Sequence, residues 1–333
     1  MSVRIGINGF GRIGRLVARM AVKRKDMELC GINDITDAKT LAHLFKYDSV
    51  HGIFQGEVSH TENSIIIDGK EVKISAERNP ENLKWNELKA DIIVESTGFF
   101  TKKEDAEKHL KAGAKKVIIS APAKNKVDAT IVLGVNEKVY DKANHHIVSN
   151  ASCTTNCLAP LVKVMLDNFG IVSGMMTTIH SYTNDQRILD LPHSDLRRAR
   201  AAMLSMIPTS TGAAKALGLV IPEVDGKMDG VSVRVPTADV SLVDLSLVTE
   251  KTTSKDEVNK VFKKASESEE LKRYLEYCEL PLVSVDFLGN SHSAIFDSQQ
   301  TFVKGNLVKI FAWYDNEYGY SSRVVDLIEF MMR

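Results

Sequence analysis

The chain has 333 residues, enough for two domains with separate cores, and its 43 Lys and Arg residues are matched by 43 Asp and Glu residues. This balance gives no indication of a nucleic-acid or acidic-membrane partner, and no run of about 18 apolar residues predicts a membrane helix. The first residues read as a core strand, so we expect no signal peptide. Four cysteines without a disulfide framework fit the cytoplasm.

The N-terminal sequence VRIGINGFGRIG predicts a strand, a glycine-rich turn and the start of a helix. In this dinucleotide fingerprint Gly9 makes the tight turn, Gly11 lets backbone approach a pyrophosphate, and Gly14 allows close packing of helix on strand. A second apolar run, MELCGIND, ends at Asp34, 20 residues after Gly14. An acid at that offset accepts hydrogen bonds from the adenine ribose, so the sequence predicts nucleotide binding.

Apolar runs alternate with helical stretches through the first 150 residues. The predicted strands are 5–8, 27–33, 91–96, 116–120 and 130–134, and the predicted helices are 14–24, 37–46 and 103–113. Such alternation predicts a mostly parallel sheet, with Asp68-Gly69 as the turn of an antiparallel hairpin. The predicted fold class is α/β, with a Rossmann-type dinucleotide-binding domain over residues 1–152.

The stretch SNASCTTNC places Cys153 among Ser, Thr and Asn just before the apolar run LAPLVKVML, which reads as a helix. Cys153 would then lie in the first helical turn, where unpaired N–H groups and a partial positive charge favour a thiolate and a nearby anion. The alternative is a small apolar residue at a helix start. Cys157 follows four residues later, but no further Cys/His pair has ligand spacing, so we expect no metal site.

Beyond Cys153 the predicted strands become longer and crossover helices fewer. Strands are predicted over 171–183, 230–248 and 306–313, an amphipathic helix over 255–268, and a final helix from residue 323. This pattern predicts a second, α+β domain over residues 153–316 with a mainly antiparallel sheet. The polar, arginine-rich stretch 184–202 is too long for an ordinary connection, which points to a functional or interface loop.

Six motifs occur in order along the whole chain: INGFGRIGR, KYDSVHG, ASCTTNC, STGAAKA, VRVPT and WYDNEYGYS. Together they resemble the phosphorylating glyceraldehyde-3-phosphate dehydrogenases of the bacterial type. A shared Rossmann fold does not account for six motifs in register. The resemblance implies an NAD-dependent homotetramer, with a C-terminal helix (317–333) that returns to the nucleotide-binding domain.

The resemblance also implies a mechanism of oxidative phosphorylation. Cys153 would add to the aldehyde of glyceraldehyde 3-phosphate, and His180 would act as the base. Hydride transfer to NAD would leave a thioester, which inorganic phosphate would attack to give 1,3-bisphosphoglycerate. The alternative for His180 is a histidine that only hydrogen bonds at the end of a buried strand.

Binding residues follow from the resemblance motif by motif. The substrate phosphate is assigned to Thr183, Asp185 and Arg234, and the attacking phosphate to Ser152, Thr154, Arg198, Thr211 and Gly212. The cofactor is assigned to Gly9, Gly11, Arg12, Ile13, Gly14, Asp34, Arg78, Thr97, Gly98, Ser120, Asn316 and Tyr320. Arg234 also makes sense alone, because a charge that interrupts an apolar strand needs an anionic partner. Asn316 could instead be a turn residue and Tyr320 simple core packing.

Charge predicts the choice of cofactor, since Asp34 would repel the 2′-phosphate of NADP. Ile35 and Pro192 also match the NAD-specific pattern of the family. Two departures are noted: Thr237-Ala238-Asp239-Val240 replaces the commoner TPNV, and Ser210 stands where Thr is frequent. The alternatives are erythrose-4-phosphate dehydrogenase and a non-catalytic redox or nucleotide sensor that uses Cys153 and Cys157.

Overall fold

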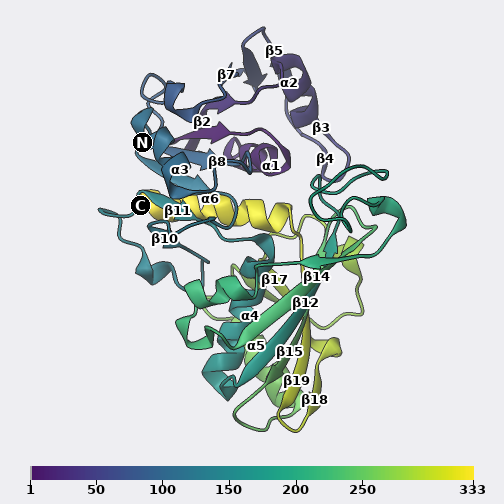
Figure 1. Ribbon diagram of the computed structural model, residues 1–333. Helices are drawn as coiled ribbons and strands as arrows, with labels where there is room; N and C mark the ends of the chain where they lie inside the picture. The colour runs from purple at the N-terminus through teal and green to yellow at the C-terminus, as the bar shows by residue number, and fades with distance from the viewer. Residues whose placement is uncertain (1) are drawn as a thin grey trace. The chain divides into compact units, whose positions relative to one another are not determined.

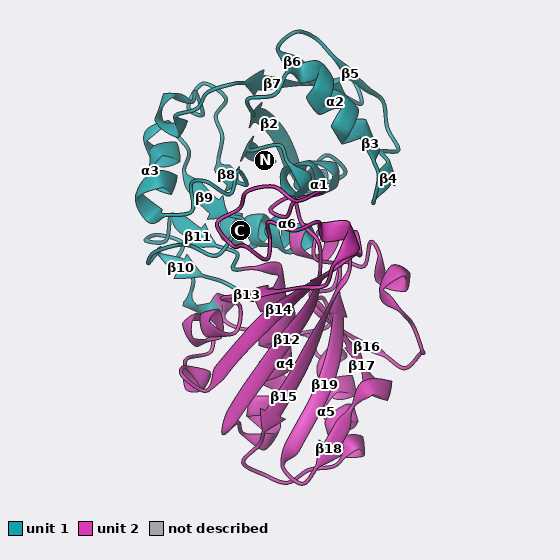
Figure 2. Ribbon diagram, turned by 45° about the vertical axis from the view of Figure 1, so that its right-hand side comes forward, with its two compact units in different colours: residues 1–131, 138–151, 321–333 teal, residues 132–137, 152–320 magenta. Residues whose placement is uncertain are grey.

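The computed structural model describes residues 2–333 and divides into two compact units (Figures 1 and 2). Unit 1 comprises residues up to 131, 138–151 and 321–333, and unit 2 comprises 132–137 and 152–320. From the sequence, the domain boundaries were predicted after residues 152 and 316. The assignment of segment 132–137 to unit 2 was not predicted. Within residues 2–333, no helix is long and apolar enough to cross a membrane.

Unit 1 is built on a nine-stranded sheet in the order β10-β11-β9-β8-β1-β2-β7-β6-β5. The strands are β1 (Val3–Asn8), β2 (Met27–Asn33), β5 (Val58–His60), β6 (Ser64–Ile67), β7 (Lys70–Ser75), β8 (Ile92–Glu95), β9 (Lys116–Ile119), β10 (Ala129–Thr130) and β11 (Ile147–Ser149). All pairs from β10 to β7 are parallel, while β6 pairs antiparallel with β5 and β7. The predicted Rossmann-type α/β fold is confirmed.

Helices and a small hairpin complete unit 1. The helices are α1 (Arg12–Ala21), α2 (Ala38–Lys46), α3 (Lys103–Lys111) and α6 (Tyr318–Met332), and the two-stranded hairpin is β3 (Tyr47–Asp48) with β4 (Gly52–Ile53). The part of α6 within unit 1 is fixed there by an Arg24–Glu329 ion pair of 3.0 Å and by the Tyr140 ring, 5.5 Å from Phe330. Residues from the two ends of the chain therefore build one core.

Two local predictions for the first 150 residues have different outcomes. Asp68 and Gly69 both have positive φ (47° and 77°), as a type I′ turn between β6 and β7 requires, so the predicted hairpin is confirmed. The strand predicted over 130–134 is wrong beyond Thr130. The chain turns there because Val135 N–H donates to the carbonyl of Val132, while the Asn136 side chain accepts from Val132 N–H.

Unit 2 carries an eight-stranded sheet in the order β13-β14-β12-β15-β19-β17-β16, with β18 beside β19. The strands are β12 (Ser173–Ser181), β13 (Ile207–Ser210), β14 (Met228–Val235), β15 (Ser241–Val248), β16 (Leu275–Cys278), β17 (Ala294–Asp297), β18 (Phe302–Lys304) and β19 (Leu307–Tyr314), and the helices are α4 (Cys153–Phe169) and α5 (Lys255–Ser266). Only β12–β14 and β16–β17 pair in parallel. The mainly antiparallel sheet is confirmed, although the strand predicted over 230–248 is divided by a turn.

The two faces of the unit 2 sheet differ in burial. Along β12, Met176, Thr178 and His180 are buried, whereas Met175, the residue before Met176, is 62% exposed. On α5, Phe262 stacks on Phe296 of β17 with ring centroids 4.0 Å apart, so the helices cover the buried face. The strand alternation therefore directs His180 to the helix-covered side of the sheet.

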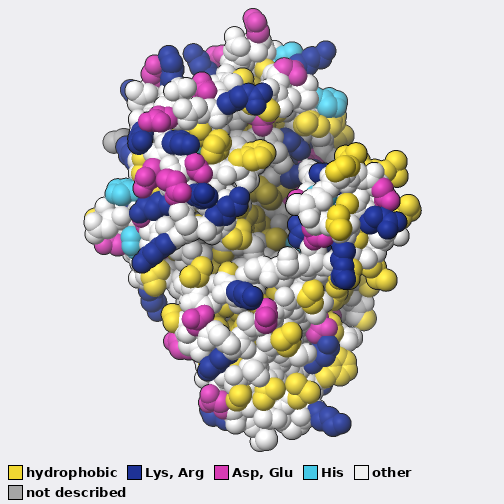
Figure 3. Space-filling model, in the orientation of Figure 1, with side chains coloured by type: hydrophobic (Ala, Val, Ile, Leu, Met, Phe, Trp, Pro, Cys, Tyr) yellow, Lys and Arg dark blue, Asp and Glu magenta, His cyan; other side chains and the backbone are white. Residues whose placement is uncertain are grey.

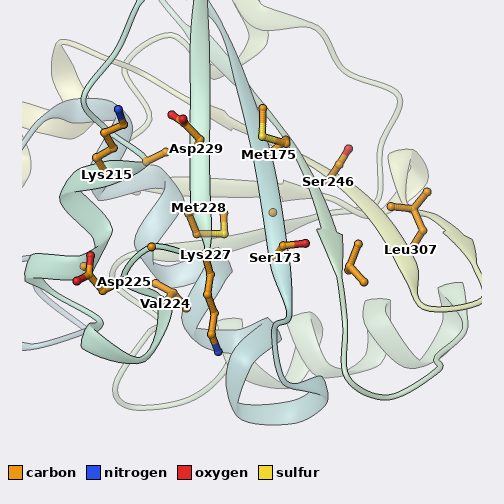
Figure 4. Close-up of a pocket in the computed structure, with 15 residues that line it drawn as sticks. Ser173, Met175, Lys215, Val224, Asp225, Lys227, Met228, Asp229, Ser246 and Leu307 are labelled. Carbon is orange, nitrogen blue, oxygen red and sulfur yellow. The ribbon is translucent and has the colours of Figure 1, made fainter.

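A hollow of unit 2 lies at the starts of β12 and β14 (Figure 4). Met175, Lys215 and Asp229 are among the residues that line it. His180 and Arg234 lie near the other ends of the same two strands, paired with each other in register. The hollow is therefore remote from these two predicted site residues.

Candidate active site

Cys153 is the first residue of α4, as predicted from the sequence around it. Ser152 caps the helix, because its side chain accepts a hydrogen bond of 2.9 Å from Thr155 N–H. Ala151, just before the cap, has a φ of 53°, an uncommon conformation for a residue with a side chain. A constrained backbone thus presents the Cys153 sulfur at a helix N-terminus.

His180, near the end of β12, faces this sulfur. Its Nε2 lies 3.6 Å from Cys153 Sγ, and its Nδ1 lies 2.7 Å from the carbonyl oxygen of Ser181. The short contact assigns the proton to Nδ1, which donates to that carbonyl. Nε2 therefore keeps its lone pair toward the sulfur and can accept the thiol proton.

Arg234, near the end of β14, approaches the same pair. Its Nη1 lies 3.0 Å from His180 Nδ1, 3.1 Å from the Ser181 carbonyl and 3.5 Å from Thr183 Oγ1. Its Nε is buried and has no hydrogen-bond partner among residues 2–333. A guanidinium with an unused buried donor is suited to an anion that the protein does not itself supply.

The surroundings of Cys153 and His180 set their protonation. Burial raises the pKa of Cys153, although Arg234 opposes this shift. Burial and then the charge of Arg234 lower the pKa of His180 to about 3. Both groups are consequently held neutral. From the sequence we expected the helix N-terminus to favour the Cys153 thiolate, but burial has the larger effect on the pKa of Cys153. Cys153 remains partly accessible, so a small molecule can reach it.

Arg198 forms a second cationic centre in unit 2. Its Nε donates to Thr209 Oγ1 at 2.9 Å, and its Nη1 pairs closely with Asp185. Asp195 lies 3.6 Å from Nε and also accepts from Thr209 Oγ1. These partners fix the guanidinium in one orientation.

The carboxyl ends of four parallel strands in unit 1 carry the predicted cofactor residues. Gly9 follows β1, Asp34 follows β2, Thr97 lies just beyond β8, and Ser120 follows β9. In open α/β sheets ligands bind at this edge, beside the point where strand order reverses. Here that point lies between β1 and β8.

The turn after β1 fits a dinucleotide. A side chain at Gly9 would place its Cβ 2.6 Å from Thr97 N, and one at Gly14 would collide with the Gly9 carbonyl. Around Gly11 the space is open, as backbone contact with a pyrophosphate requires. The Asp34 carboxylate accepts from Phe10 N–H at 2.8 Å, which holds it beside the turn.

Comparison with known proteins agrees with this geometry. Residues 3–103 match the family model for the glyceraldehyde 3-phosphate dehydrogenase NAD binding domain, and residues 152–316 match that for its C-terminal domain. The chain is 61% identical over 332 residues to glyceraldehyde-3-phosphate dehydrogenase of Geobacillus stearothermophilus, covering 99% of this chain and 98% of the relative. It is 58% identical over 334 residues to glyceraldehyde-3-phosphate dehydrogenase 1 of Bacillus subtilis, covering 100% and 99%.

The chain belongs to the glyceraldehyde-3-phosphate dehydrogenase family. The predicted family and the predicted NAD-binding domain are confirmed. Each relative above carries the same enzyme name, which does not favour the erythrose-4-phosphate dehydrogenase or sensor alternatives.

The remaining predicted cofactor residues of this glyceraldehyde-3-phosphate dehydrogenase family member are distributed over both units. Arg12 pairs with Asp48 at 2.7 Å, and Arg78 is exposed. In unit 2, Asn316 Oδ1 accepts from Ser241 Oγ at 2.6 Å, which leaves its amide N–H groups as donors. Residues Ile13, Gly98 and Tyr320 complete the set. Their roles toward NAD stay predictions.

Most of the predicted phosphate-binding side chains already form hydrogen bonds or ion pairs within the protein. The Ser152 hydroxyl caps α4, and the buried Thr154 hydroxyl lies 2.9 Å from Tyr314 Oη. Asp185, assigned to the substrate phosphate, is a carboxylate that pairs with Arg198, so we expect it to orient that arginine. Thr211 Oγ1 accepts from a backbone N–H at 3.2 Å, and the space around Gly212 is open.

Tyr314 is a site residue that sequence reasoning did not assign. It is almost fully buried, and its hydroxyl lies 2.8 Å from Thr178 Oγ1 as well as 2.9 Å from Thr154 Oγ1. Its ring meets that of His180 edge-on, with centroids 6.1 Å apart. Tyr314 thus connects the start of α4 to β12. Strand alternation along β19, which places it on the buried face, was the available signal.

Asp239, which stands where the family commonly has Asn, lies beside a second buried carboxyl group. Asp239 and Asp315 are both buried, and their side chains share a hydrogen bond. Burial and the neighbouring Asp239 raise the pKa of Asp315. Two adjacent carboxylates cannot both ionise at low cost, so this pair retains a proton where an Asn–Asp pair would not need one.

Proposed function

We propose that this protein is an NAD-dependent phosphorylating glyceraldehyde-3-phosphate dehydrogenase, which converts glyceraldehyde 3-phosphate and inorganic phosphate to 1,3-bisphosphoglycerate. The observation that carries the proposal is the approach of Cys153 Sγ to His180 Nε2 at 3.6 Å, beside Arg234. A nucleophile, a base with a free lone pair and an anion-binding cation are what thioester chemistry on a phosphorylated aldehyde requires.

His180 and Cys153 perform the proton and acyl steps. Nε2 takes the thiol proton, and the thiolate adds to the aldehyde carbon, whose oxygen receives a proton to give a hemithioacetal on Cys153. When bound, NAD accepts the hydride that this carbon loses. His180 removes the hydroxyl proton during that oxidation, which leaves a thioester. A phosphate oxygen then attacks the acyl carbon, the C–S bond breaks, and Cys153 leaves as thiolate.

Two arginines support the assignment of two anions. Arg234, with its unpartnered Nε, would bind the substrate phosphate together with Thr183. Arg198, oriented by Asp185 and accompanied by Thr211 and Gly212, would bind the attacking phosphate. A cation for each anion also counters the repulsion that a second phosphate would meet near the first.

A homotetramer is supported by the loop that follows β12. Seven large apolar side chains on it are exposed by 49–82%: Ile188, Leu189, Leu191, Leu196, Met203, Leu204 and Met206. Figure 3 shows apolar side chains at the surface where this loop lies in Figure 1, on a face that otherwise mixes both charges. Such a patch marks an interaction surface.

A cytoplasmic location is supported by the four free cysteines of the protein.

The reaction is tested by following NADH formation from glyceraldehyde 3-phosphate with and without phosphate, with erythrose 4-phosphate as competing aldehyde. We expect sustained turnover only with glyceraldehyde 3-phosphate and phosphate together. Full-rate turnover in phosphate-free buffer that releases free 3-phosphoglycerate would show a hydrolytic enzyme instead.

A further inference from the structure

A chain of hydrogen bonds crosses the core of unit 1 and ends at the predicted cofactor turn. Trp85 Nε1 donates to His109 Nδ1 at 3.0 Å, and His109 Nε2 lies 2.9 Å from Glu95 Oε2. Trp85, His109 and Glu95 are each no more than 2% exposed. These three residues come from the β7–β8 connection, from α3 and from the end of β8. None was assigned a role in binding or chemistry.

Glu95 is the branch point of this chain. Besides His109, its Oε2 accepts from Asn8 Nδ2 at 2.5 Å, while its Oε1 accepts from Thr97 N–H at 2.9 Å and from Thr97 Oγ1 at 2.5 Å. Asn8 immediately precedes Gly9, and a Cβ on Gly9 would touch Thr97 N. One buried carboxylate thus joins the end of β1, where the glycine-rich turn begins, to the loop that follows β8.

The hydrogen bonds have a defined direction. Because Trp85 donates to Nδ1, His109 carries its proton on Nε2 and donates it to Glu95. On the other side, Thr97 Oγ1 donates to Glu95 and accepts from Phe99 N–H at 3.1 Å, which fixes the turn through Gly98, whose φ is 76°. The chain therefore orders the Thr97–Phe99 loop from within the core.

A purely structural reading would make this cluster an anchor for α3. That reading leaves the carboxylate unexplained, because an apolar side chain could pack α3 on the sheet without the cost of burying a charge. Three of the four donors to Glu95 lie beside the Gly9 turn, one on Asn8 at the end of β1 and two on Thr97 just beyond β8, and only His109 lies on the helix. The bonds converge on the ligand edge of the sheet.

We propose that Glu95 is a positioning residue for NAD, held by the Trp85–His109 pair so that it fixes Thr97 against the Gly9 turn in the shape that binds the cofactor. This inference rests on the proposed placement of NAD at the Gly9 turn. It extends the set of residues that determine cofactor affinity into the core, to side chains that the cofactor itself does not touch.

The test measures NAD binding to the full-length protein by calorimetry, without substrate, together with hydrogen exchange of the Thr97–Phe99 amides and the melting temperature. Glu95→Gln adds an amide donor that must face Thr97 on one side or Asn8 and His109 on the other. We expect the Kd for NAD to rise about tenfold or more and exchange at Thr97–Phe99 to accelerate.

A pair of variants at His109 separates positioning from packing and also decides the matter if Glu95→Gln does not fold. His109→Gln can place an amide donor where Nε2 lies, whereas His109→Leu cannot. We expect His109→Leu to weaken NAD binding several-fold, by about the loss of one hydrogen bond to a charged group, and His109→Gln to recover most of it.

Lys116→Gln is the matched control. Lys116 is also buried, and it donates to the carbonyls of Lys142 and His145 at the opposite end of the same sheet. The Lys116→Gln substitution should lower the melting temperature and leave the Kd for NAD within about twofold of the wild-type value. Wild-type Kd values in Glu95→Gln and His109→Leu, with melting temperatures lowered as in the control, would overturn the proposal. Because no substrate is present, failure of the proposed phosphorylating reaction would not affect this result.

Discussion

In unit 1 predicted cofactor residues lie at the ends of parallel strands. The turn after β1 depends on Gly9 and Gly14, because a side chain at either position would collide with backbone. In unit 2 the side chains of Cys153, His180 and Arg234 come from a helix and two neighbouring strands and contact one another. The first site is thus made largely of backbone and the second largely of mutually perturbed side chains. Substitutions in unit 2 should therefore change the chemical step, and those in unit 1 should change NAD affinity.

Cys153→Ser should show the largest effect. Without the sulfur nucleophile, dehydrogenase turnover should fall more than about 1,000-fold, while the Kd for NAD measured by calorimetry should stay near that of the wild type. Cys157→Ser is the control, because Cys157 lies one helical turn further along α4 and is fully buried. It should cost stability but keep activity, and limiting iodoacetamide should label Cys153 first.

His180→Asn should come next, with turnover about 100- to 10,000-fold lower. The imidazole Nε2 that accepts the Cys153 proton is lost. The pH at which Cys153 reacts with iodoacetamide at half its maximal rate should therefore also rise. Near wild-type turnover at neutral pH would show that another group accepts the proton. An unchanged Kd for NAD would sharpen the contrast between the two units.

The two arginines test how far unit 2 can be divided. Arg198→Leu should mainly raise the KM for phosphate, and Arg234→Leu mainly that for the phosphorylated aldehyde, each by more than about tenfold. Because Arg234 also contacts His180, Arg234→Leu should lower kcat as well. Equal effects of both substitutions on both KM values would mean that a single shared anion site exists.

Asp34→Ala should be the counterpart in unit 1. It removes an acceptor for the ribose and the charge that repels a 2′-phosphate, so NAD should bind about tenfold more weakly and the preference over NADP should narrow. The kcat at saturating NAD should change little. If wild-type protein used NAD and NADP with equal kcat/KM, Asp34 would not determine the choice.

Asp239→Asn should give the smallest effect, and on stability rather than catalysis. Burial and Asp239 raise the pKa of Asp315 to about 7 from its ordinary 3.8. A raised pKa in the folded state means that stability is lost as pH rises between these values. Removing the like charge should therefore raise the free energy of unfolding by about 1–3 kcal/mol at neutral pH and by little below about pH 4. Denaturant titrations of both proteins at several pH values test this, and a constant difference across pH would contradict it.

The contrast between the units also explains what the sequence could predict. Glycine spacing determines backbone shape directly, so the turn at Gly9 and the hairpin at Asp68-Gly69 followed from the residues alone. The position of Cys153 near a helix start followed from polar residues just before an apolar run. These signals are local in sequence.

What the sequence could not predict depends on partners far along the chain. Thr154, whose role at a phosphate stays a prediction, has its hydroxyl 2.9 Å from that of Tyr314, 160 residues away. The ion pair of Asp185 with Arg198 was also not predicted, while the role of Asp185 at the substrate phosphate stays a prediction. The neutral state of Cys153 and His180 likewise results from burial, which no motif encodes. Only the three-dimensional arrangement reveals these couplings.

The most direct test of the central claim is rapid mixing of the NAD-bound enzyme with glyceraldehyde 3-phosphate in phosphate-free buffer, followed by acid quench and peptide mass analysis. We expect a burst of NADH equal to the number of subunits, with the phosphoglyceroyl group on the peptide that contains Cys153 and its release on addition of phosphate. A burst of NADH without acyl group on Cys153, or with the group on another residue, would contradict it.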